Sequence, residues 1–172
     1  MPPALTRLAA TALTGTVLAV LAPVGAHADG TVDRELASTK KALDVYVDEE
    51  RALADGYLPD GECVEGAEGV MGHHYVRWDR IDRELDARAP EALVYQPDGY
   101  GGRELVAVEY FYADEDQDVS TDDDRPRLFG QPFDGPSEPQ APGLPVNYSL
   151  HVWLWQENPD GLFSPWNPRG SC

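Results

Sequence analysis

The chain has 172 residues and a formal net charge of −18, with 31 acidic side chains against 13 basic ones. A surface with this charge repels nucleic acid and anionic membranes, which excludes partners of those two classes. A small molecule or a metal ion is the expected partner, and the composition predicts no particular oligomeric state.

The first segment, Met1–Ala28, has the features of a secretory signal peptide. Its one charged residue is Arg7, an apolar stretch runs from Leu8 to about Val24, and Ala26-His27-Ala28 is a small-residue cleavage signature. A membrane anchor is the alternative, because the apolar run of about 17 residues reaches the short end of the spanning range. We predict cleavage, which leaves a single secreted, extracellular domain over residues 29–172 with a formal charge of −19 and no membrane association.

Cys63 and Cys172 are the two cysteines of the chain. An even number of cysteines in an exported protein favours one disulfide bond. The bond would tie the C-terminus to the end of the first helical region. Metal ligation by the two thiols is the alternative.

Two elements are predicted in the first half of the chain. Apolar residues recur at spacings of three and four from about Val32 to Tyr57, which predicts a helix that ends near Gly56. A short strand is predicted over residues 71–77. Period-two alternation along it places His74 with Gly72 and Val76 on one face, which we expect to be the inner face.

A hairpin is predicted next, with arms at residues 92–96 and 104–112 joined by the turn-forming Pro97–Gly102. The second arm, ELVAVEYFY, is apolar on both faces, which indicates a central strand. Glu109 is the anomaly in this arm. A buried ionised carboxylate must be paired, bound to a metal or neutralised.

Residues 113–145 are dense in Asp, Pro and Gly and predict a long acidic loop. Asp114, Asp116 and Asp118 have the spacing of a calcium-binding loop, but Val119 and Arg125 occupy positions that such a loop gives to Gly and Glu. A solvated acidic loop is therefore expected. Weak calcium binding by Asp114–Asp124 stays open.

A last strand is predicted over residues 148–155. Alternation puts His151, Trp153 and Trp155 on one face and three aliphatic side chains on the other. A buried histidine needs a polar partner. The predicted fold is therefore α+β: an N-terminal helix packed on an antiparallel sheet of at least four strands, with a long acidic loop rich in Pro and Gly.

The leading hypothesis for the site is a metal centre made by His74, Glu109 and His151. Two imidazoles and a carboxylate from three strands suit a divalent transition metal ion such as zinc, iron, manganese or copper. The side chains expected to form the wall of this site are His73, Tyr75, Trp153 and Trp155.

Two alternatives stay open. In the first, each histidine is a satisfied core residue and Glu109 forms an ordinary ion pair. In the second, the protein is a metal-free binding module for a small ligand or glycan, which stacks on the aromatic residues Tyr110, Tyr112, Trp153, Trp155 and Trp166. Neither an enzymatic activity nor a catalytic residue is indicated by any local signature.

Several motifs together carry a resemblance. They are G-x-H-Y at residues 72–75, L-V-A-V-E-Y at 105–110, L-F-G at 128–130, and L-H-V-W-L-W-x-x-N-P from Leu150, with a C-terminal Cys172. The chain resembles a family of small secreted bacterial proteins that is frequent in actinomycetes. The resemblance implies no particular activity. Its G-x-H-Y motif falls on His74 and favours this residue over His73.

Overall fold

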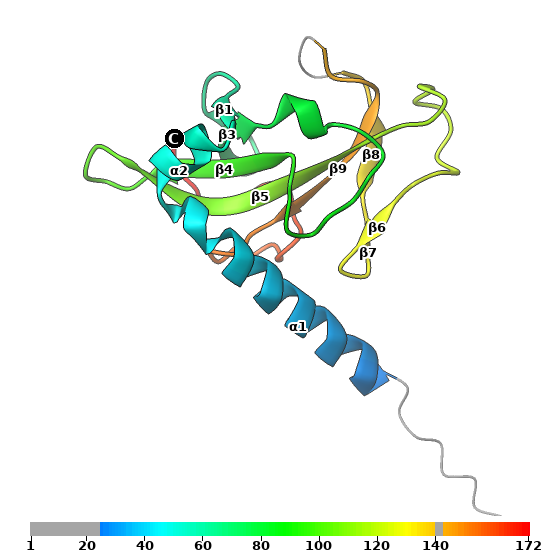
Figure 1. Ribbon diagram of the computed structural model, residues 1–172, viewed down its shortest axis with the longest axis horizontal. Helices are drawn as coiled ribbons and strands as arrows, with labels where there is room; N and C mark the ends of the chain where they lie inside the picture. The colour runs from blue at the N-terminus through cyan, green and yellow to red at the C-terminus, as the bar shows by residue number, and fades with distance from the viewer. Residues whose placement is uncertain (1–24, 140–142) are drawn as a thin grey trace, which may run out of the picture.

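The computed structural model describes residues 25–139 and 143–172 and has an α+β fold, in which helices pack on an antiparallel sheet (Figure 1). The helical elements are α1 (Gly25–Leu43), α2 (Glu49–Ala54) and two 3-10 turns, η1 (Asp44–Val47) and η2 (Trp78–Arg80). The strands are β1 (Leu58–Pro59), β2 (Val64–Gly66), β3 (Gly69–Val76), β4 (Ala92–Pro97), β5 (Arg103–Ala113), β6 (Arg127–Leu128), β7 (Gln131–Pro132), β8 (Asp134–Ser137) and β9 (Asn147–Val152).

The main sheet has seven strands in the order β1-β3-β4-β5-β9-β8, with β2 added to β3. All of these neighbours pair antiparallel. β5 lies in the middle of the sheet, which confirms the predicted central strand. The predicted hairpin is also confirmed, since the Asp98 side chain accepts the backbone N–H groups of Tyr100 and Gly102 and closes the turn between β4 and β5.

One face of the sheet carries the main core. The helical segment lies across this face (Figure 1), and Leu43, Ala52 and Tyr57 pack against tyrosines of the sheet. Tyr75 of β3 belongs to this core and is 1% exposed. The His74 side of β3, which was predicted to be the inner face, is also largely buried, since Gly72 and Val76 are covered, but it faces away from this core. Both faces of β3 carry apolar residues, so alternation alone did not separate them.

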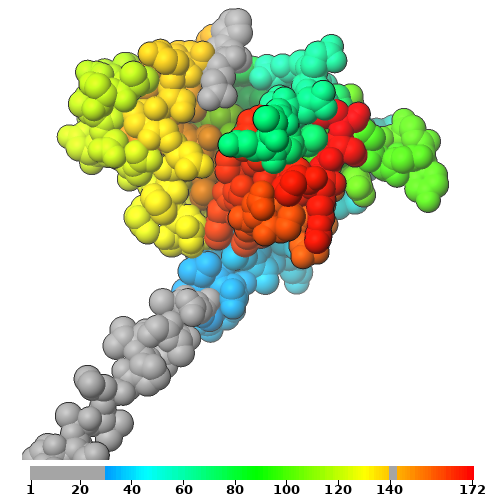
Figure 2. Space-filling model, turned by 180° about the vertical axis from the view of Figure 1, so that it is seen from behind, coloured from blue at the N-terminus to red at the C-terminus, as the bar shows by residue number. Residues whose placement is uncertain are grey.

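The other face is covered by the C-terminal segment that follows β9 (Figure 2). Trp153 and Leu162 pack there on Val94 and Ala107. Residues Asn167 and Val70 exchange both backbone hydrogen bonds, at 3.0 and 3.1 Å. Gly69 permits this approach, because an added Cβ would lie 2.6 Å from the Asn167 carbonyl carbon.

Three boundaries differ from those predicted. The first helix begins at Gly25 and breaks at Asp48, whose side chain accepts the backbone N–H of Glu50 and caps α2. β9 ends at Val152 instead of 155, because the Trp153 N–H turns to the Leu162 carbonyl. The acidic loop also contains β6, β7 and β8.

Cys63 and Cys172 form a disulfide with a Cα–Cα distance of 5.7 Å, as predicted, so metal ligation by these cysteines is excluded in this form. Within the described residues, no helix has the length and apolar character needed to span a bilayer. The signal peptide predicted for Met1–Ala28 lies outside the described residues, apart from its last four residues at the start of α1, and stays a prediction.

Replacing Cys172 with serine should lower the free energy of unfolding by about 2–5 kcal/mol, because the bond closes a loop of 109 residues in the unfolded chain. Guanidinium denaturation of oxidised wild type and Cys172→Ser gives the difference. A Ser171→Ala variant is the matched control. Equal midpoints for wild type and Cys172→Ser would contradict a stabilising role for the disulfide.

Candidate metal centre

The strand register brings Glu109 and His151 together. Glu109 of β5 lies directly opposite His151 of β9 and directly opposite Ala92 of β4. Residues opposite each other in paired strands point to the same face. Glu109 and His151 are therefore neighbours on the face away from the main core, and their side chains are almost fully buried, with 7% and 3% exposed.

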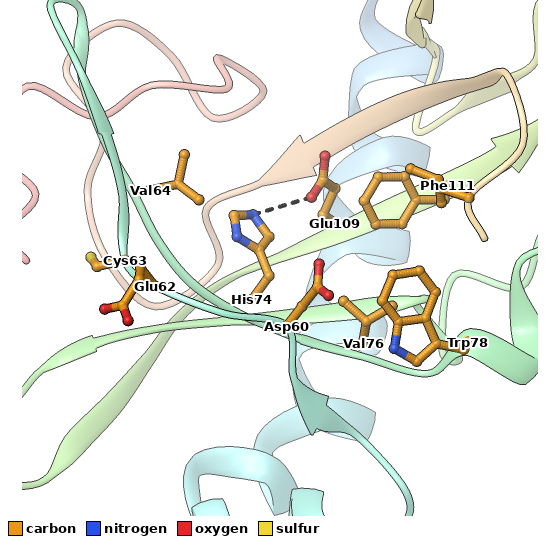
Figure 3. A pocket seen from close by; sticks show the side chains of 10 residues that line it. Asp60, Glu62, Cys63, Val64, His74, Val76, Trp78, Glu109 and Phe111 are labelled. Carbon is orange, nitrogen blue, oxygen red and sulfur yellow. Dashed lines mark ion pairs between the residues drawn. The ribbon is translucent and has the colours of Figure 1, made fainter. Parts of the chain in front are cut away.

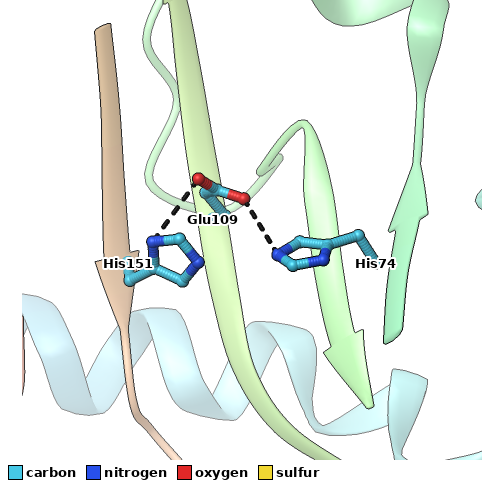
Figure 4. A group of neighbouring side chains, drawn as sticks. All are labelled: His74, Glu109 and His151. Carbon is cyan, nitrogen blue, oxygen red and sulfur yellow. Dashed lines mark ion pairs between the residues drawn. The ribbon is translucent and has the colours of Figure 1, made fainter. Parts of the chain in front are cut away.

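His74 reaches the same point from β3, two strands away from β5. Its partner on β4 is Val94, and the next residue on that face of β4 is Ala92. The side chain at this position is the small Ala92, and Figure 4 shows the His74 imidazole extended toward Glu109. Three strands thus supply one side chain each.

The distances describe a compact cluster. His74 Nε2 lies 3.2 Å from Glu109 Oε2, and His151 Nδ1 lies 3.4 Å from Glu109 Oε1. The two imidazole rings are perpendicular, with centroids 5.8 Å apart. One ligand atom from each residue can be chosen so that all three lie within 4.8 Å of one another.

The charges in the cluster suit cation binding. Burial acts to raise the pKa of Glu109, but the two histidines and the Ser149 hydroxyl outweigh it, so the pKa is lowered and the group is a carboxylate. Burial lowers the pKa of His151 despite the opposing attraction of Glu109. A neutral imidazole beside a carboxylate is the protonation state that a metal ion requires.

One ring nitrogen of the cluster lacks a partner. His151 Nε2 is buried and has no hydrogen-bond partner among the described residues. Buried polar atoms are normally paired, so an orphaned nitrogen calls for an explanation.

A cavity of about 460 Å³ opens in front of the cluster (Figure 3). His74 and Glu109 lie on its wall, while His151, on the other side of Glu109 from His74 in Figure 4, is not a lining residue. The remaining lining residues are Asp60, Glu62, Cys63, Val64, Val76, Trp78, Phe111 and Leu144.

The side chains predicted as the wall do not line this cavity. His73 and Tyr75 project from the opposite face of β3, where Tyr75 joins the main core. Trp153 belongs to the smaller apolar cluster beside Ala107. Trp155 lies beyond the end of β9, and its indole N–H donates to Asp44. The alternation that placed Trp155 beside His151 stops where the strand stops.

The aromatic residues proposed for ligand stacking do not form an exposed platform either. Tyr110 is 0% exposed, and its hydroxyl donates to the Ala87 carbonyl. Tyr112 packs beneath Arg83, and Trp166 packs on Gly66. The aromatic rings on the cavity wall are Trp78 and Phe111, which the sequence analysis did not select for this role.

The acidic loop uses its carboxylates for local structure. Asp114 and Asp116 both accept the Asp118 N–H, and Asp124 accepts from the Tyr148 hydroxyl. Within residues 25–139 and 143–172, this loop adds no second set of three metal-ligating side chains.

Comparisons with protein-family models, with curated proteins and with solved structures gave no match. The resemblance to the secreted actinomycete family therefore stays a prediction.

A second buried carboxyl, Glu91, lies just before β4. It accepts the Phe111 N–H at 3.0 Å and lines a separate hollow with the acidic Asp82, Glu84 and Asp86. Burial raises the pKa of Glu91 to about 8, although the Phe111 N–H opposes the rise. The group is thus protonated in the folded protein at neutral pH. No sequence pattern marked it, because it stands at a strand edge after Pro90.

The free energy of unfolding should depend on this proton. Glu91 titrates near 4.5 when unfolded and near 8 when folded, so its contribution is complete below pH 4.5 and is lost as the pH rises to about 8. Glu91→Gln, which imitates the neutral acid, should gain stability relative to wild type across this window, on the order of 5 kcal/mol in total. Urea denaturation between pH 4.5 and 9 measures the difference.

Glu84→Gln, an exposed change in the same hollow, is the control and should follow the wild-type profile. A constant difference between Glu91→Gln and wild type at every pH would refute the protonated carboxyl.

Proposed function

We propose that this protein binds a divalent transition metal ion through His74, Glu109 and His151. The observation that carries the proposal is the convergence of three ligand atoms, from three separate strands, to within 4.8 Å of one another. Two imidazoles and a carboxylate form a donor set that zinc, iron, manganese and copper all accept.

The spacing supports this role. Ligand atoms around a tetrahedral ion with bonds of about 2.0–2.1 Å lie roughly 3.4 Å apart. Each imidazole already has about this separation from one Glu109 oxygen: His74 Nε2 lies 3.2 Å from Oε2, and His151 Nδ1 lies 3.4 Å from Oε1. A pair at the outer limit of 4.8 Å must close by about 1.4 Å, and the His74 side chain that faces the cavity is 12% exposed.

A bound metal ion also accounts for two features that a metal-free core does not explain. Glu109 is a carboxylate in a central strand, and among the described residues its contacts include no lysine or arginine. His151 has a buried ring nitrogen without a partner. A bound cation neutralises the Glu109 carboxylate. Coordination or a metal-bound water gives the buried His151 nitrogen a partner.

The coordination sites left free by three protein ligands would face the cavity. His74 and Glu109 both lie on its wall, so a small molecule in the cavity can reach the ion. When bound, the ion supplies Lewis acidity to such a molecule. The alternative, a metal-free module for a small ligand or glycan, keeps the same cavity but would use Trp78 and Phe111.

We further propose that the protein works outside the cytoplasm after removal of Met1–Ala28. The disulfide supports this, since such bonds persist in oxidising compartments. Intact-mass analysis of protein from the culture medium should give a chain that begins at Asp29. A full-length chain in the membrane fraction would contradict cleavage.

His151→Ala should abolish stoichiometric metal binding, because it removes one of three ligands. The protein is stripped with a chelator, reloaded with zinc, dialysed and measured by elemental analysis. His73→Ala is the matched control, since the neighbouring histidine projects from the opposite face of β3 and should leave one ion per chain.

Glu109→Gln provides a second variant that keeps the shape of the side chain and removes its charge, and it should also lose the ion. Circular dichroism confirms that each variant is folded. A full equivalent of zinc in both His151→Ala and Glu109→Gln would refute the site.

A further inference from the structure

We propose that the cavity beside the metal centre binds a small organic cation, an ammonium group carried on an apolar body. This deepens the proposed function by naming the class of ligand, and it rests on that function in using the same cavity. The observation behind it is a wall that combines carboxylates with aromatic rings and, among its described lining residues, contains no lysine or arginine.

The carboxylates come from two segments. Asp60 and Glu62 stand on the connection between β1 and β2, and Glu109 stands at the back of the cavity. In Figure 3 the Asp60 carboxylate points into the space between His74 and Trp78. Neither Asp60 nor Glu62 forms an ion pair with a lysine or arginine in the part of the chain that the structure describes.

The basic side chain that directly follows β3 is turned away from the cavity. Arg77 forms an ion pair with Asp79, donates to the Asp55 carbonyl and lies over the Tyr57 ring on the core side. No lysine or arginine among the described residues therefore forms an ion pair with these carboxylates. With a net charge of −18, the whole chain also attracts cations and repels anions.

The apolar part of the wall fits the body of such a ligand. Phe111 follows Glu109 by two residues and so projects from the same face of β5, and Trp78 stands on η2 just beyond β3. Figure 3 shows the two rings side by side next to Val76. Aromatic faces attract ammonium groups, and Trp does so most strongly.

The size of the cavity is consistent with a small molecule. Its volume of about 460 Å³ lies within the range of roughly 300–1,000 Å³ found for small-molecule sites. The carboxylates would orient the charged group, and Trp78, Phe111 and Leu144 would hold the apolar body.

Three probes with one shared ring test the charge preference: benzylammonium, benzyl alcohol and benzoate. Calorimetric titration of chelator-treated protein should give an affinity at least tenfold higher for benzylammonium than for benzyl alcohol, and no measurable binding of benzoate. The indole N–H resonance of Trp78 should shift on binding. Equal affinities for the three probes, or tighter binding of benzoate, would overturn the proposal.

The double variant Asp60→Asn with Glu62→Gln should reduce the affinity for benzylammonium to that of benzyl alcohol and leave benzyl alcohol unchanged. Glu65→Gln, an exposed change on β2 outside the cavity wall, is the control and should behave as wild type. Unaltered benzylammonium binding by the double variant would refute the role of these carboxylates.

Zinc-loaded protein separates this proposal from the metal site. Benzyltrimethylammonium, which has no lone pair to coordinate zinc, should still bind to it. If zinc binds stoichiometrically but no ammonium probe binds to either form, the cation pocket is wrong and the metal site stands. If the probes bind but zinc does not, the metal site is wrong and the cation pocket stands.

Discussion

The arrangement of the candidate site follows from a carboxylate in the middle of the sheet. Glu109 is 5% exposed and stands on β5, an interior strand that pairs with β4 and β9. A charge in this position is stable only beside groups that compensate it. The strand register places His151 on β9 directly opposite Glu109. The small Ala92 on β4 lets His74 approach Glu109 from the other side. Replacing Ala92 with a larger residue would fill the space that the His74 ring crosses.

The two faces of the sheet are covered by different parts of the chain. Tyrosines and the helical segment build the main core on one face, so the fold does not depend on the polar cluster. The other face has a thinner cover, the C-terminal segment, held by paired Asn-Pro turns in which the Asn158 and Asn167 side chains accept nearby backbone N–H groups. The disulfide fastens the end of this cover beside the cavity, since Cys63 lines it. The site opens where the cover ends.

Sequence patterns predicted the parts of this arrangement that are local. Glu109 and His151 were detectable because each interrupts an apolar alternation, and the hairpin was detectable from its turn residues. The helix break at Asp48 was missed, because apolar spacing continues across it while a side-chain cap starts a new helix. Asp60, Trp78 and Phe111 gave no signal, since they meet only when the β1–β2 connection folds over β3 and β5. The wall predicted from Trp155 failed because β9 leaves the ladder at Val152.

X-ray absorption spectroscopy of zinc-loaded wild-type protein tests the central claim most directly, because it reads the ligands of the ion itself. The expected spectrum contains two imidazole nitrogens at about 2.0–2.1 Å and at least one oxygen, with the outer-shell scattering that imidazole rings produce. An environment of oxygen alone, without imidazole scattering, would place the ion among surface carboxylates and contradict the His74, Glu109 and His151 centre.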